Sequence, residues 1–264
     1  MVGRVLAQVR FRGTIRERSV EPYLGLLEQV RLRKKFAGLL FDISSGGGDA
    51  VASSDLYRAV KRVAAVKPVV ATIGSMAASG GYMAVLGARK VFAHDESDVG
   101  SIGIFIPHIS VATLLSRLGV EVELLHLGKH KDAYQGLRPL TEEERSKIMA
   151  VAQVGYDSFI ELVARERKAP VARIRELATG EFWSGRQALG LGLIDALGDG
   201  EDAREELSRM TGVPSGKTVL VTPRVPFLPR WLFGLGQGVA ASTQLALTDV
   251  LEDAVLESLR FRGR

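Results

Sequence analysis

Residues 69–82 read VVATIGSMAASGGY. The first five residues are apolar or β-branched and follow Pro68, which predicts a short buried strand. Small residues come next, and we expect a helix from Tyr82 to about Ala88. Ser79 therefore lies where a strand gives way to a helix, close to helical N–H groups that lack partners and carry a positive dipole. An oxyanion could be stabilised there, so Ser79 is a candidate nucleophile, although a tightly packed turn has the same pattern.

Predicted strands and helices alternate on both sides of this stretch. The other predicted strands cover residues 5–11, 37–43, 90–93, 103–106 and 120–127. The other predicted helices cover residues 20–34, 51–66, 110–118, 141–168, 170–179, 184–190 and 201–210. This alternation predicts the α/β class, with a layered sheet flanked by helices.

Composition excludes several classes of function. The chain has 264 residues, of which 46% are hydrophobic and 25% charged, as in a globular protein of one large or two small domains. The 35 basic and 30 acidic residues are interleaved, so nothing resembles a nucleic-acid-binding arm and no nucleic-acid partner is expected. There is no cysteine, and the four histidines are not spaced as metal ligands. We therefore expect neither a metal nor a cofactor.

The composition changes near Thr211. Four of the nine prolines fall between residues 214 and 229, which predicts an extended connector. We expect a catalytic domain at 1–211, and a connector and amphipathic helix at 212–264. The helix would carry one apolar stripe made of Leu247, Leu251, Val255 and Leu259. This stripe either docks on the protein itself or a neighbouring subunit, or touches a membrane together with residues 231–233.

No segment is a clear leader or membrane span. Residues 1–15 alternate apolar and polar side chains and predict a strand, without the apolar core of a signal peptide. The uncharged runs 68–88 and 231–248 contain several glycine, serine or other polar residues, which argues against a span. We expect the protein to be membrane-associated or cytoplasmic.

Three separated features could supply one catalytic site. Glycines occupy positions 46–48 after a predicted strand, Ser79 follows the next strand, and residues 128–132, GKHKD, follow a third. Where strand ends converge, these features could provide oxyanion donors, a nucleophile and a base. Taken singly, a glycine run is usually a turn and the lysines of a polar loop are usually solvated.

Several segments, taken in their order along the chain, resemble the signal peptide peptidase A family of serine proteases. This family is peptidase family S49, which has the ClpP/crotonase-type fold. The similarity covers about residues 5–210, and its most specific part is MAASGGY at 76–82 together with HKD at 130–132. The other segments are ISSGGG at 43–48, VGSIGI at 99–104 and TEEE at 141–144.

The resemblance implies a role for individual residues. Ser79 would be the nucleophile, Lys131 the general base, and Ser101 would orient the lysine. The implied oxyanion donors are the N–H groups of Gly46, Gly47 and Gly80. Substrates would be remnant signal peptides or other apolar, membrane-derived peptides, cleaved through an acyl-enzyme. An apolar groove for them is expected near Met76, Met83, Ile104 and Phe105.

The chain departs from the family pattern in three ways. Ser45 stands where the family usually has proline, which should loosen the glycine turn. The membrane-spanning N-terminus common in the family is missing, and there is one catalytic-domain length. Short members are expected to build the site across the subunits of a ring, so Ser79 and Lys131 could come from neighbouring chains.

A base role makes a demand on the lysine. A free lysine is almost fully protonated at pH 7, and burial disfavours its ammonium form. We therefore expect Lys131 in apolar surroundings and Lys129 in solvent. Ser75 is a competing nucleophile, and Ser79 is preferred because Gly80 and Gly81 give it nearby backbone donors.

Three alternatives remain. A Ser-His-Asp peptidase would need a histidine where Ile104 stands, since His108 lies beyond Pro107. A crotonase-like acyl-CoA enzyme would use the glycine turn without Ser79 or Lys131. A catalytically inactive ring could organise membrane partners.

Overall fold

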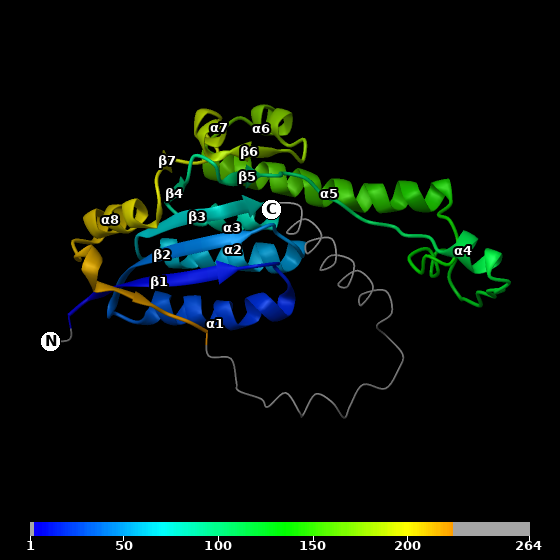
Figure 1. Ribbon diagram of the computed structural model, residues 1–264, viewed down its shortest axis with the longest axis horizontal. Helices are drawn as coiled ribbons and strands as arrows, with labels where there is room; N and C mark the ends of the chain where they lie inside the picture. The colour runs from blue at the N-terminus through cyan, green and yellow to red at the C-terminus, as the bar shows by residue number, and fades with distance from the viewer. Residues whose placement is uncertain (1–2, 224–264) are drawn as a thin grey trace, which may run out of the picture. The chain divides into compact units, whose positions relative to one another are not determined.

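The computed structural model describes residues 3–223 (Figure 1). They fall into two compact units, the first comprising residues 3–106 and 147–223 and the second residues 107–146. The predictions for residues 231–233 and for the Leu247–Leu251–Val255–Leu259 stripe lie outside the described part of the chain.

The first unit contains a mainly parallel sheet in the order β6-β5-β3-β2-β1-β8, with β4 and β7 joined to it through β3. Its three long strands point in the same direction in Figure 1 and are β1 (Val5–Arg12), β2 (Phe36–Ser45) and β3 (Val69–Ala78). Its short strands are β4 (Lys90–Ala93), β5 (Asp98–Gly100), β6 (Phe182–Ser184), β7 (Ala196–Leu197) and β8 (Thr218–Leu220). Only β6 runs antiparallel, against β5, among the pairings described. The α/β class is confirmed.

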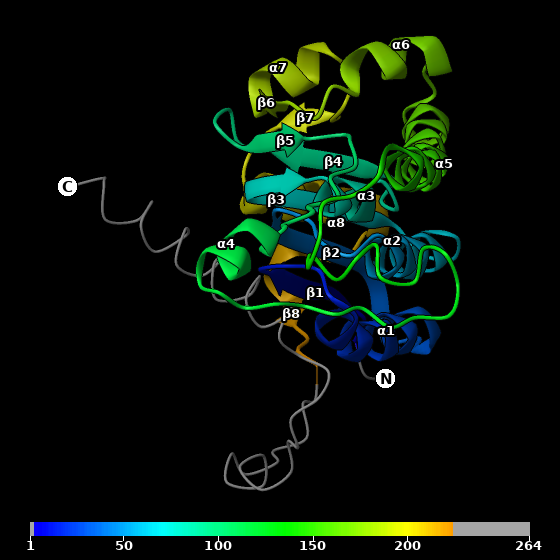
Figure 2. The ribbon, with the colours of Figure 1, turned by 90° about the vertical axis from the view of Figure 1, so that its right-hand side faces the viewer.

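The sheet carries helices on both faces. The helices of this unit are α1 (Glu17–Leu32), α2 (Ala50–Ala64), α3 (Gly80–Val85), α6 (Val171–Leu177), α7 (Gly185–Gly190), α8 (Gly200–Thr211) and most of α5 (Glu142–Arg167). Figure 2 shows α1 and α2 together on one face, where alternate strand residues such as Val9, Phe41 and Ile43 are fully buried. Residues of the opposite parity, such as Leu40, pack with Leu207 of α8. Because both faces are covered over β2 and the first half of β3, these segments are largely apolar, whereas β1 ends with the exposed Arg10 and Arg12.

Strand β3 is longer than predicted, since it continues to Ala78 instead of ending at residue 73. Its first half pairs with β4, and its second half pairs with β5 through Met76–Asp98 and Ala78–Gly100. The small residues at 74–78 therefore continue the strand instead of forming a turn.

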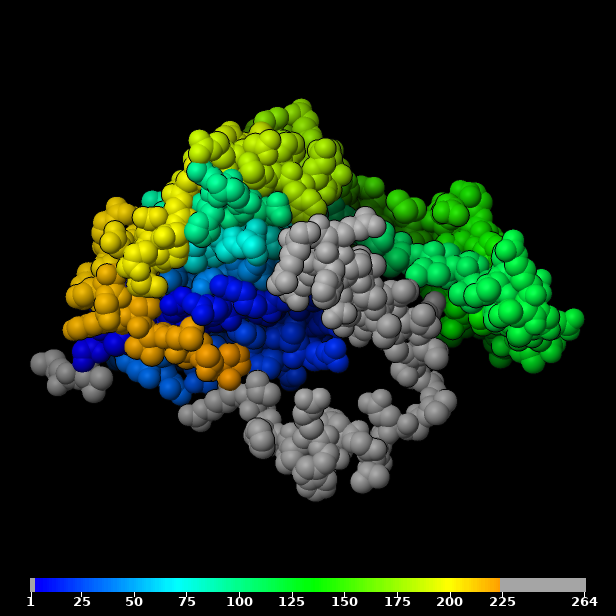
Figure 3. Space-filling view, viewed as in Figure 1, coloured from blue at the N-terminus to red at the C-terminus, as the bar shows by residue number. Residues whose placement is uncertain are grey.

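The sheet also extends past residue 211. Strand β8, orange in Figure 3, lies beside β1 through the pairs Leu6–Thr218 and Gln8–Leu220. The boundary at residue 211 stays a prediction. None of the described helices is long and apolar enough to cross a membrane.

The second unit has little regular structure. It contains α4 (Ala112–Arg117), which buries no residue, and the first turn of α5. The strand predicted at 120–127 is absent, and the one predicted at 103–106, at the end of the first unit, is irregular as well. Apolar side chains in these segments are exposed instead of pairing in a sheet, notably Phe105 at 85%, Leu125 at 86% and Leu127 at 96%.

Candidate active site

The ends of three neighbouring strands place the predicted residues of the first unit together. Ser45, the last residue of β2, pairs with Ala77, and Ala78, the last residue of β3, pairs with Gly100, the last of β5. The segments that follow are the glycine turn, Ser79 and Ser101. Ligands of parallel α/β sheets usually bind at the carboxyl ends of the strands. The structure thus gathers these sequence-predicted groups at one edge.

Ser79 is held in an unusual backbone conformation. Its φ of 50° and ψ of −119° lie in a region that favours glycine, and it directly precedes the first residue of α3. The conformation is fixed from both sides, because the Ser79 N–H donates to the Gly100 carbonyl at 2.7 Å and the Ser79 carbonyl accepts from Met83 N–H at 2.9 Å. Such strain costs about 1–3 kcal/mol and collects at functional sites. A strained serine between strand and helix is the arrangement that exposes a nucleophile.

The glycine turn lies directly against Ser79. Gly47 has a φ of 95°, and a Cβ there would lie 2.7 Å from the Gly80 nitrogen and 2.8 Å from the Ala78 carbonyl oxygen. A Cβ on Gly80 would lie 2.0 Å from the Ser53 hydroxyl of α2. Both positions therefore require glycine, and their backbones pack against each other beside the serine.

These backbones offer candidate oxyanion donors. Gly80 N–H is the first of α3, where helical N–H groups have no partner within the helix. Gly47 N–H donates to Ser45 Oγ at 3.1 Å, and Ser45 is only 2% exposed. The Ser45 hydroxyl thus closes a local turn over the glycines, and the expectation that this turn is looser than with proline stays a prediction. Gly46 is exposed, with only Met76 Sδ near its Cβ position, at 3.6 Å.

Ser101 adopts a second strained conformation, with a φ of 47°. Its N–H donates to the Glu181 carbonyl at 2.8 Å, and its hydroxyl donates to the Gly180 carbonyl at 3.2 Å. With its proton committed to Gly180, the hydroxyl oxygen is left to accept a hydrogen bond from another group. An amine could be that donor, which suits an orienting residue.

Ser75 occupies a different environment. It lies within β3, is exposed, and its hydroxyl shares a 2.5 Å hydrogen bond with that of Ser44. It has neither the strained backbone nor the adjoining helix start that Ser79 has.

Lys131 belongs to the second unit, whereas Ser79 belongs to the first. The lysine lies in a turn closed by its N–H, which donates to the Gly128 carbonyl at 3.1 Å. Lys129 is exposed, as expected, and pairs with Glu143 at 2.5 Å. Lys131 is also exposed in the single chain, so the apolar surroundings expected for it are absent there.

The four residues expected to line a substrate groove have different surroundings. Met76 is half-buried beside the glycine turn, and Met83 is half-buried against the main core. Ile104 is 41% exposed and faces Gly155 of α5, and Phe105 is 85% exposed. The substrate groove stays a prediction.

The comparison with protein families settles the classification. The sequence model described as peptidase family S49 matches residues 61–213, more than half of the chain. The chain belongs to peptidase family S49. The match includes Ser79, Ser101 and Lys131.

Relatives support a peptidase. The chain is 32% identical to a putative protease of Synechocystis over 94% of its own length and 90% of that protein. It is 34% identical to the chloroplastic serine protease SPPA of Arabidopsis thaliana over 83% of its length, which is only 33% of the plant protein. It is 29% identical to a putative signal peptide peptidase SppA of Enterococcus faecium, over 87% of its length and 68% of that protein.

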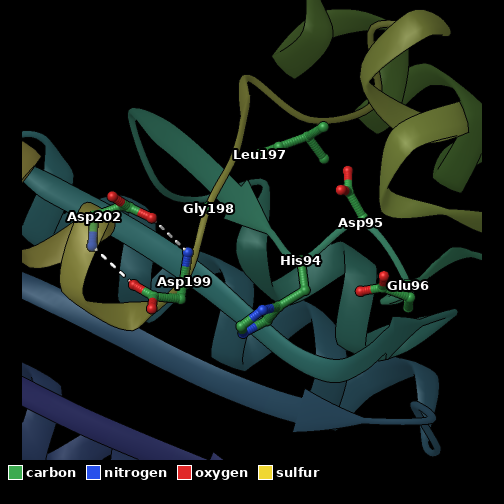
Figure 4. Close-up of a pocket in the computed structure, with 7 residues that line it drawn as sticks. All are labelled: His94, Asp95, Glu96, Leu197, Gly198, Asp199 and Asp202. Carbon is green, nitrogen blue, oxygen red and sulfur yellow. Dashed lines mark hydrogen bonds between the residues drawn. The ribbon is translucent and has the colours of Figure 1, made fainter.

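A separate hollow of about 360 Å³ in this S49 family member has different chemistry (Figure 4). Its lining residues are His94, Asp95, Glu96, Leu197, Gly198, Asp199 and Asp202. Asp199 caps α8, and Figure 4 shows its reciprocal hydrogen bonds with Asp202, so these carboxylates are engaged in holding the helix start. The hollow lacks a serine or lysine nucleophile. No group of His, Asp and Glu among residues 3–223 is arranged to hold a metal ion.

Sequence reasoning missed three residues near the proposed catalytic groups. Ser45 looked like a defect in the glycine turn, whereas its hydroxyl binds that turn. Ser53 of α2 contacts Gly80, a long-range contact with no signal in the local sequence. Arg138 binds Asp132, the residue after Lys131, and the nearby charge pattern RPLTEEE was the only available signal.

Proposed function

We propose that the chain is a serine endopeptidase that uses Ser79 as nucleophile and Lys131 as general base. The observation that carries this proposal is the strained backbone of Ser79 beside the Gly47–Gly80 contact. A crotonase-like acyl-CoA enzyme would have no use for a strained serine at this place, so the peptidase is favoured over it.

The reaction would proceed in two halves. Ser79 Oγ attacks the peptide carbonyl carbon while the neutral Lys131 amine takes the hydroxyl proton. The developing oxyanion is stabilised by Gly80 N–H and the adjacent glycine turn. The protonated lysine then gives its proton to the leaving amine, which leaves an acyl-enzyme. Water, deprotonated by the same lysine, releases the acid and restores Ser79. Ser101 would accept a hydrogen bond from the lysine and orient it.

We further propose that a second copy of the chain completes the site. Lys131 is exposed in the single chain, which leaves it without the desolvation that a neutral amine needs at pH 7. Exposed apolar residues of the second unit, such as Leu125 and Leu127, are surface that an oligomer would bury. Apolar peptides, including remnant signal peptides, are the proposed substrates, in keeping with the name of the Enterococcus relative.

Labelling with a serine-reactive phosphonate tests the nucleophile. We expect covalent labelling of the native protein and of Ser75→Ala, the matched control, and none of Ser79→Ala. Labelling that survives in Ser79→Ala and disappears in Ser75→Ala would reverse the assignment, and no labelling at all would support the inactive ring.

Mixing two inactive variants tests the shared site. If Ser79 and Lys131 meet across subunits, Ser79→Ala and Lys131→Ala should regain peptidase activity when they are dissociated and reassembled together. A mixture that stays inactive while the oligomer forms would place both residues in one chain.

Particle mass in solution gives the number of subunits. Cleavage of a labelled signal peptide, compared with a charged control peptide, tests the substrate class.

A further inference from the structure

The guanidinium of Arg138 joins two buried carboxylates in the second unit. Arg138 Nε and NH2 donate to the two oxygens of Asp132 at 2.6 and 2.9 Å. Arg138 NH1 and NH2 donate to the two oxygens of Glu144 at 2.8 and 2.6 Å. Asp132 is 7% exposed and Glu144 only 3%. One planar fork thus satisfies two carboxylates that would be costly to bury alone.

The two carboxylates belong to different elements. Asp132 is the residue after Lys131, in the turn at 128–135. Glu144 lies in the first turn of α5 and forms a capping box with Thr141, whose N–H donates to Glu144 at 2.9 Å. Arg138 therefore ties the lysine-bearing turn to the start of a helix.

The same hydrogen bonds engage charged groups next to Lys131 in the sequence. Both Asp132 oxygens accept from Arg138, and His126 Nε2 lies 3.2 Å from one of them. On the helix side, His130 lies within 3.4 Å of Glu143 and Glu144, and Lys129 pairs with Glu143. Arg138 holds the pKa of Asp132 and of Glu144 below their ordinary values by hydrogen bonding to the ionised forms. A carboxylate released from Arg138 beside Lys131 would favour the ammonium form of that lysine, which cannot act as a base.

We propose that Arg138 is a positioning residue for Lys131. It fixes the 128–135 turn to α5 and keeps the Asp132 carboxylate from pairing with the lysine. The inference rests on the proposed role of Lys131 as general base.

The test compares Arg138→Lys and Arg138→Ala with the control Arg145→Met. Arg145 lies in the same segment, and its exposed side chain pairs with Glu142 at 3.6 Å. Lysine keeps the charge of Arg138 but cannot bind two carboxylates bidentately. We expect kcat to fall by about 10²-fold in both Arg138 variants, the effect of a misplaced reacting group, with KM nearly unchanged. The rising limb of the pH–rate profile should move to higher pH, and added guanidinium should partly restore Arg138→Ala.

Amide hydrogen exchange provides a readout independent of activity. Residues 128–135 should exchange faster in both Arg138 variants and at the native rate in Arg145→Met. The inference fails if the Arg138 variants match Arg145→Met, or if kcat falls with no shift of the pH limb and no guanidinium rescue. Lys131→Ala separates this failure from that of the proposed function: if that variant keeps full activity, the base assignment is wrong whatever Arg138 does.

Discussion

Backbone geometry holds one half of the proposed machinery, and charge holds the other. At the strand ends of the first unit, Ser79 and Ser101 have positive φ and Gly47 packs against Gly80 without room for a side chain. In the second unit, Lys131 is exposed, and the turn that carries it is fixed by the hydrogen bonds of Arg138 to Asp132 and Glu144. The first kind of site should resist salt and acid but tolerate no added methyl group. The second should tolerate added volume and fail when its charges are lost.

The largest expected effect tests the backbone half. Gly47→Ala should lower kcat by about 10²–10³-fold, because a Cβ would meet the Gly80 nitrogen at 2.7 Å and displace a proposed oxyanion donor. Gly25→Ala in α1 is the control, since nothing lies within 4 Å of its Cβ position. Peptide hydrolysis and phosphonate labelling of both variants check this. Equal losses in the two variants would show that the turn does not hold the site in the way described.

The sequence predicted the parts that depend on local pattern. The alternation of apolar residues located β1, β2 and α2 closely, and the capping box located the start of α5. Gly74–Ala78 were misjudged because their small side chains suggest a turn, whereas pairing with β2 and β5 extends the strand. The largely alternating pattern VEVELLHL at 120–127 predicted a strand, but no partner strand is available in the described part of the second unit. The strain of Ser79 could not be predicted, because it is imposed by tertiary contacts such as the hydrogen bond to Gly100.

A second prediction separates strain from chemistry at Ser101. Ser101→Gly should raise stability by about 1 kcal/mol, since glycine accepts the φ of 47° without strain. It should also lower kcat about tenfold or more, because the hydroxyl proposed to orient the lysine is gone. Thermal unfolding and steady-state kinetics measure the two effects. A gain in stability with unchanged kcat would make Ser101 a purely structural residue.

A third prediction concerns Ser45, whose side chain restrains the glycine backbone. Ser45→Ala should cost about 0.5–1.5 kcal/mol of stability, because the buried Gly47 N–H loses its partner. Its effect on kcat should be well below that of Gly47→Ala, since the glycine backbone itself is unchanged. Ser44→Ala, which removes only an exposed pairing with Ser75, is the control in chemical denaturation. A neutral Ser45→Ala would mean that the glycines hold the turn without it.

The smallest effect is expected at the charged half, and only in acid. Hydrogen bonds from Arg138 lower the pKa of Asp132 and Glu144. For a lowered carboxyl pKa, the stabilisation is complete above the ordinary value of about 4 and is lost as the pH falls toward the folded value. The protection factors of the amides at residues 128–135 should therefore stay high from pH 7 to 5 and fall below about pH 4. The amides of β2 and β3 should keep their protection to lower pH. In Arg138→Lys the loss of protection at residues 128–135 should begin at higher pH. Simultaneous loss of protection in both regions would mean that charge and backbone hold the two halves as one cooperative unit.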